Sequence, residues 1–119
     1  MKLRIRGNSI RLRLTKGEVE RVAAGETIEE IVDLYPMPLT YSLVPREAVK
    51  LEAVFDGGSL AVTVPEHQAA AWASGDAVGM EEVSGGVRLL IEKDWACAKP
   101  RAEEDESDMF EHPEASAAC

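Results

Sequence analysis

The chain has 119 residues, which is enough for one modest hydrophobic core but not for two. Its residues are 45% hydrophobic and only 5% aromatic. No run of about 18 apolar residues is present, so we expect no segment that spans a membrane. The N-terminal run of alternating apolar and basic residues lacks the apolar core of a signal peptide, and a cytoplasmic location is expected.

The formal net charge of −9 is unevenly distributed along the chain. Residues 1–50 hold nine Lys or Arg against seven Asp or Glu, whereas residues 94–119 hold two against eight. A basic beginning and an acidic end indicate an interaction surface or a solvated tail, and they do not indicate a particular fold.

The sequence repeats itself between residues 5–14 and residues 55–64, which read IRGNSIRLRL and FDGGSLAVTV. The correspondence continues downstream, where Val22 aligns with Trp72 and Gly25 with Gly75. Such self-similarity predicts one supersecondary unit that is used twice.

Each half begins with two alternating strands joined by a tight turn. In the first half Gly7-Asn8 forms the loop, and a type I′ turn with a positive φ at both residues is expected. The resulting register sets Leu3 opposite Leu12. Gly57-Gly58 is expected to form the equivalent turn in the second half.

A short helix is predicted after each hairpin. Thr15 and Glu18 have the spacing of a capping box, and Gly25 is expected to end the first helix. In the second half Pro65 is expected at the first helical position and Gly75 at the end. Two further strands then close each half.

The expected fold is therefore α+β and mostly β. Two strand–strand–helix–strand–strand halves, about 1–46 and 47–93, are expected to form a pseudo-twofold small barrel or an interlocked sheet in one domain, residues 1–93. In this arrangement each half can cover the unpaired strand edges of the other. Residues 94–119 do not continue the pattern, and we expect an acidic tail that is extended or disordered when it is unbound.

The first half, with Arg6-Gly7-Asn8-Ser9 and the basic run 11–16, resembles the beginning of AbrB/MazE-type swapped-hairpin proteins. Segments 60–65, 75–78 and 86–91 of the second half resemble the helix, Gly-Asp turn and closing hairpin of the same family. The opening and the tail from 97 to 113 also resemble an uncharacterised family of small bacterial proteins.

The swapped-hairpin resemblance implies interlocked copies, DNA binding by basic hairpin arms and an acidic tail that grips a toxin. The positions that correspond to the arm are Arg6, Asn8, Ser9, Arg11 and Arg13. Here both copies lie in one chain, and the second arm carries no arginine. One chain therefore offers one basic arm, and recognition of both halves of a palindromic DNA site would need two chains. The expected oligomeric state is a monomer or a homodimer.

The outward face of the first hairpin is strongly basic. The residues expected on it are Lys2, Arg4, Arg6, Arg11 and Arg13. The register places Arg4 opposite Arg11, and facing like charges cost up to about 1 kcal/mol. Three interpretations are open: a solvated strand face, a nucleic-acid or phosphate site, and a receptor for an acidic peptide such as the chain's own tail.

The tail has two main interpretations, a solvating end or a segment that binds a protein partner. The candidate contact residues are Glu103, Glu104, Asp105, Asp108, Met109 and Phe110. The acidic run lacks the ligand spacing of a calcium loop. Cys97, His112 and Cys119 are weak candidates for a metal site, because they lack the close ligand spacing typical of zinc sites.

The sequence contains no glycine-rich phosphate loop, nucleophile elbow or zinc-ligand set. We therefore expect a non-enzymatic binding protein without a cofactor, such as an antitoxin-like or transcriptional regulator that uses the basic arm and the acidic tail. The alternative is a protein-interaction or metal-handling module that does not bind nucleic acid. An enzyme of the small-barrel type ranks third.

Overall fold

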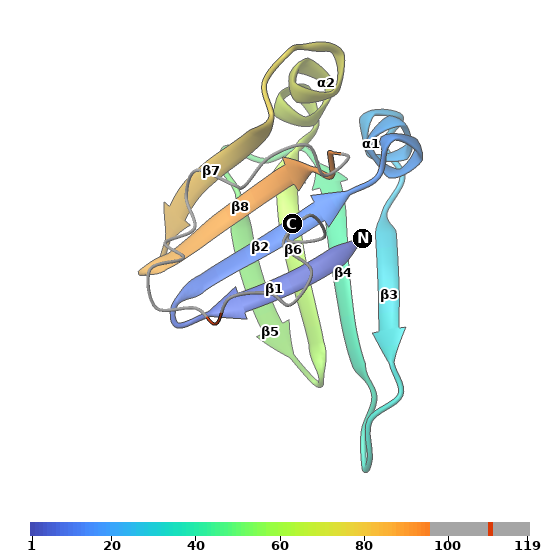
Figure 1. Cartoon of the computed structure of the whole chain (residues 1–119), viewed down its shortest axis with the longest axis vertical. Helices are drawn as coiled ribbons and strands as arrows, with labels where there is room; N and C mark the ends of the chain where they lie inside the picture. Colours follow the sequence, from blue (N-terminus) through green and yellow to red (C-terminus); the bar gives the residue numbers. More distant parts are fainter. Residues whose placement is uncertain (96–109, 111–119) are drawn as a thin grey trace.

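The computed structural model describes residues 1–95 and Phe110. Within this part of the chain the order strand, strand, helix, strand, strand occurs twice (Figure 1). The first half consists of β1 (Lys2–Arg6), β2 (Ser9–Leu14), α1 (Lys16–Ala23), β3 (Ile28–Val32) and β4 (Leu39–Arg46). The second half consists of β5 (Glu52–Asp56), β6 (Ser59–Pro65), α2 (Glu66–Ser74), β7 (Gly79–Ser84) and β8 (Val87–Lys93). The predicted α+β, mostly β class is confirmed.

The two halves interlock, because each sheet takes one hairpin from each half. The first sheet has the order β1-β2-β8-β7, and the second has the order β3-β4-β6-β5. At the centre of the sheets β2 runs parallel to β8 and β4 runs parallel to β6. Of the two forms that the sequence left open, the described strands adopt the interlocked one, as two open sheets and not as a closed barrel.

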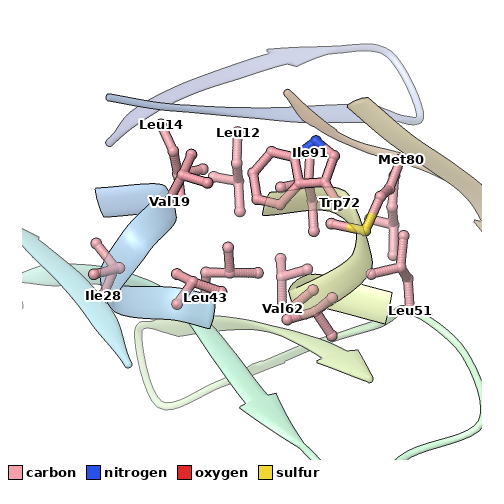
Figure 2. Packing of buried hydrophobic residues seen from close by; sticks show 14 residues of the cluster. Leu12, Leu14, Val19, Ile28, Leu43, Leu51, Val62, Trp72, Met80 and Ile91 are labelled. Atoms are coloured by element: carbon pink, nitrogen blue, oxygen red, sulfur yellow. The ribbon is translucent and has the colours of Figure 1, made fainter. Parts of the chain in front are cut away.

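The core lies between the two sheets, which are stacked with one in front of the other (Figure 1). Figure 2 shows Leu12 and Ile91 of the first sheet pointing toward Leu43 and Val62 of the second. These four side chains are at most 2% exposed. Burial of aliphatic side chains from both halves holds the interlocked sheets together.

The hairpin turns agree with the prediction in place but only partly in type. Gly57 and Gly58 both have positive φ values, 57° and 79°, as a type I′ turn requires. In the first hairpin Gly7 has a φ of 54°, but Asn8 does not have a positive φ. The type I′ prediction is therefore wrong there: positive φ at the first central residue alone is the pattern of a type II′ turn, which needs only one glycine.

Both helices are short and lie at one end of the sandwich (Figure 1). The capping box of α1 is confirmed, with Thr15 and Glu18 bonded reciprocally. Pro65 is the N-cap of α2 and not its first helical residue, because β6 continues up to it. In α2 Trp72 is buried, and its Nε1 donates a hydrogen bond of 3.3 Å to the Val78 carbonyl. No helix in the described residues is long and apolar enough to cross a membrane.

Glu18 also ties the start of β1 to α1. Its Oε2 lies 2.5 Å from the Met1 ammonium nitrogen, and its Oε1 accepts a 2.9 Å hydrogen bond from the Thr15 N–H. Burial raises the pKa of the Glu18 carboxyl, but the hydrogen bonds from Met1 and Thr15 outweigh that effect. The pKa of Glu18 is therefore lowered from its ordinary value of 4.5.

Leu43→Ala is expected to destabilise the protein by about 2–5 kcal/mol, since it leaves a cavity between the two sheets where the native side chain is fully buried. Urea denaturation followed by circular dichroism measures the loss. Leu34→Ala is the matched control, because Leu34 is 52% exposed, and it is expected to change the free energy of unfolding by less than about 0.5 kcal/mol. Equal effects of the two substitutions would contradict the two-sheet core.

Glu18→Gln is expected to reduce the pH dependence of stability while keeping the capping hydrogen bond, which glutamine also makes. A lowered pKa contributes stability above the ordinary value of 4.5, and this contribution is lost as the pH falls through the lowered pKa. The stability difference between wild type and variant should therefore be larger at neutral pH than well below pH 4.5. Urea titrations at both pH values measure it, and a difference independent of pH would contradict the assignment.

Candidate functional site: a basic sheet face

The predicted basic row on the first hairpin is confirmed in register. Lys2 lies opposite Arg13 and Arg4 lies opposite Arg11. Because side chains alternate along a strand, these residues share the face of the sheet that points away from the core residue Leu12 and from Leu3, which packs against the core. The first hairpin therefore presents all its basic side chains on the outer side of the sandwich.

The parallel pairing of β2 with β8 extends this face into the second half of the chain. Arg11 lies beside Leu90, and Arg13 lies beside Glu92. β7 then adds Glu81, which pairs with Leu90. We call this surface the basic face; its residues are Lys2, Arg4, Arg6, Arg11, Arg13, Glu81, Arg88, Leu90 and Glu92. It carries six cationic side chains and two carboxylates.

A largely buried cluster of three charges lies on the two inner strands of the basic face, β2 and β8. Glu92 is only 6% exposed, and its Oε1 lies 3.0 Å from Arg11 Nε and 3.7 Å from Arg13 Nε. One carboxylate thus lies between two guanidinium groups that belong to the other half of the chain. This contact offsets part of the repulsion that the facing basic pairs generate.

Two further ion pairs lie nearer the borders of the basic face. Arg88 and Glu81 form an exposed ion pair across β7 and β8. Lys2 Nζ lies 3.0 Å from a carboxylate oxygen of Asp94, the residue that follows β8. Ion pairs at the protein surface contribute at most about 1 kcal/mol each, so these two position side chains more than they stabilise the fold.

A shallow hollow of about 270 Å³ opens on the β7 side of the basic face. Its lining includes Gly79, Glu81, Arg88 and Leu90. A Cβ at Gly79 would lie 2.8 Å from the Ile91 carbonyl oxygen, so a larger residue would disturb the strand pair. The hollow gives the face a mixed lining of charged and apolar groups.

The outer face of the second sheet has the opposite charge balance. Its only cation in the described strands is Arg46, against the three carboxylates of Glu29, Glu52 and Asp56. The residues in the middle of this face are small, such as Ser42 and Ala61. The protein is therefore basic on one side of the sandwich and acidic on the other.

The turn residues of the predicted arm lie at the tip of the first hairpin. Arg6 and Asn8 are exposed, whereas Ser9 is half-buried. The Asn8 carbonyl accepts a hydrogen bond of 2.8 Å from the backbone N–H of Arg88. The arm is thus fixed along its length against β8 and does not project from the body as a separate hairpin.

Most of the tail candidates lie outside the described residues, namely Glu103, Glu104, Asp105, Asp108 and Met109, and so do Cys97, His112 and Cys119. Phe110 is described and fully exposed. Among the described residues no three His, Cys, Asp or Glu side chains gather in a way that could hold a metal ion.

The sequence reasoning missed Arg88, Leu90 and Glu92 as members of the site. Alternation along β8 places these three residues on the side opposite the core residues Leu89 and Ile91, and that much is visible in the sequence. Their contact with β2 depends on a pairing across about 80 residues, for which the sequence carries no local signal.

Comparisons with known proteins add a family and no function. No curated protein and no solved structure matches the chain. A family model described as a family of unknown function, DUF7009, matches residues 1–114. The match includes both halves, the whole basic face and most of the tail. The chain therefore belongs to the DUF7009 family.

Proposed function

We propose that this protein is a non-enzymatic binding protein whose basic face contacts nucleic-acid phosphates, in the manner of an antitoxin-like or transcriptional regulator. The observation that carries the proposal is the charge asymmetry of the sandwich. One outer face has six cations against two carboxylates, and the other has one cation against three carboxylates. Surface charge needed only for solubility would not require this segregation.

The spacing of the basic residues favours a linear polyanion over a small anion. Lys2, Arg4 and Arg6 occupy alternate positions along β1, an edge strand, so neighbouring side chains are about 7 Å apart. Such a row can contact successive phosphates along one strand of nucleic acid. The same row offers no enclosed pocket for a single phosphate group.

The side chains on the basic face favour contacts with the backbone of nucleic acid and not with its bases. The outward positions of the four strands hold charged, small and aliphatic residues but no aromatic ring on which a base could stack. Binding through phosphates alone is insensitive to sequence and falls steeply as salt concentration rises.

The resemblance to swapped-hairpin regulators implies interlocked copies, and in this chain the two halves interlock because each sheet takes one hairpin from each half. Only the first arm is basic, so one chain offers a single contact surface to a duplex. In this proposal a second, equivalent contact surface on the same duplex would need a second chain.

The acidic tail supports a second contact, with a protein partner. Phe110 is fully exposed, and it lies within a run of carboxylates. An exposed aromatic ring in an acidic segment has the composition of a peptide anchor that becomes ordered on a basic partner.

The double substitution Arg4→Gln and Arg6→Gln is expected to weaken binding of a labelled DNA duplex of arbitrary sequence, measured by fluorescence anisotropy. The logarithm of the binding constant falls linearly with the logarithm of the salt concentration, and each phosphate contact contributes about 0.9 to the magnitude of that slope. Loss of two contacts should therefore make the slope shallower by about 2. Both positions are on β1, an exposed edge strand, and the substitutions retain most of the side-chain length.

The matched control is Arg46→Gln, which removes an exposed arginine from the outer face of the other sheet. It is expected to leave the salt slope unchanged. If wild type, control and double variant give the same anisotropy at every salt concentration, the basic face does not bind duplex DNA. Circular dichroism spectra of the three proteins confirm that all of them are folded.

A further inference from the structure

We propose that the acidic segment of this chain, residues 103–111, docks on the chain's own basic face. The segment has six carboxylates and no Lys or Arg, and the face has six cations and two carboxylates. The proposal concerns how the surface is occupied in the protein alone, and it does not depend on DNA binding.

The first argument is that two side chains on the outer face of the first sheet are buried. Leu90 is 5% exposed and Glu92 is 6% exposed, although both point away from the core. The neighbours of β8 are β2 and β7 within the sheet, the second sheet lies behind it, and the helices lie at one end (Figure 1). No described helix or strand covers this face, and beside Leu90 lie the long side chains of its paired neighbours Arg11 and Glu81. The low exposure of Leu90 therefore marks the middle of the face as a packed, partly apolar surface on which a further segment can lie.

The second argument is the charge of the central cluster. Arg11 and Arg13 contribute two positive charges and Glu92 one negative charge, and their side chains are only 8–16% exposed. A carboxylate of the acidic segment that reached this cluster would meet a positive charge in a partly desolvated environment, where ionic contacts are strong. Carboxylates suit such a contact, because guanidinium groups bind them through paired, charge-assisted hydrogen bonds.

The third argument is the place where the tail begins. The Asp94 N–H donates a hydrogen bond of 2.8 Å to the Leu14 carbonyl, and its carboxylate lies 3.0 Å from Lys2 Nζ. The tail therefore starts beside the paired residues Lys2 and Arg13, at one end of the basic face.

The connection is also long enough. Residues 95–102 can span up to about 26 Å when extended. The five residues of β1 cover only about 17 Å. The acidic segment can therefore lie anywhere along the basic face. A short tether also gives it an effective concentration in the millimolar range, well above that of a separate acidic peptide in dilute solution.

Docking would leave Phe110 available. This residue is fully exposed, so the ring is not what covers Leu90. The carboxylates at 103–108 are the contact groups that we assign to the face. The same tail can then hold the face with its acidic run and offer its aromatic ring to a partner.

Paramagnetic NMR on the full-length chain tests the proposal. Ser107→Cys, in a background with Cys97→Ser and Cys119→Ser, carries a nitroxide label within the acidic segment. We expect the label to broaden the backbone amide signals of β1, β2 and β8 selectively, and to spare those of β3 and β5 in the second sheet. High salt should remove the broadening.

The matched control carries the same label with Glu103→Gln, Glu104→Gln, Asp105→Asn and Asp108→Asn, which preserve size but remove charge. It should lose the selective broadening and keep an otherwise unchanged amide spectrum. Broadening that is absent, spread over both sheets, or equal in the control would overturn the proposal. Docking between molecules is tested in a mixture of two proteins: spin-labelled chains without ¹⁵N, and ¹⁵N-enriched chains without a spin label. Broadening of the same size in that mixture would overturn docking within one chain.

Discussion

The parallel pairing between β2 and β8 is the contact on which the rest of the first sheet depends. A two-stranded hairpin is at best marginally stable in water, and each half supplies only one hairpin to each sheet. The β2–β8 pair makes four strands out of two hairpins and brings Leu12 into register with Ile91. The equivalent pair β4–β6 does the same for the second sheet, and the common core forms between them.

The same pairing creates the basic face. The first hairpin alone would set like charges opposite one another without a nearby anion. β8 brings Glu92 beside Arg13 and within 3.0 Å of Arg11, so a carboxylate from one half of the chain lies among guanidinium groups from the other. The site is therefore a property of the interlocked fold and is present in neither half alone.

Local features of the fold could be predicted from the sequence, and features that depend on distant contacts could not. Alternation gave the hairpins and the Arg4–Arg11 register, and the Thr15–Glu18 spacing gave the helix start. The φ of Asn8 was predicted wrongly because a two-residue hairpin loop with Gly at its first position fits both the type I′ and the type II′ turn, and the sequence does not distinguish them. The basic half of the site was predicted, but Arg88, Leu90 and Glu92 were not, since their position rests on pairing between opposite ends of the described chain.

The interlocked strand order also constrains how the chain can fold as it is synthesised. β1 and β2 are made first, but the strand that completes their sheet, β8, comes last. The inner edge of the N-terminal hairpin, β2, must therefore wait without its strand partner until residues 87–93 have left the ribosome. Contacts between residues so far apart in sequence close slowly, because the loop entropy is lost before the contacts form. Completion of the first sheet is thus tied to synthesis of the chain as far as Lys93.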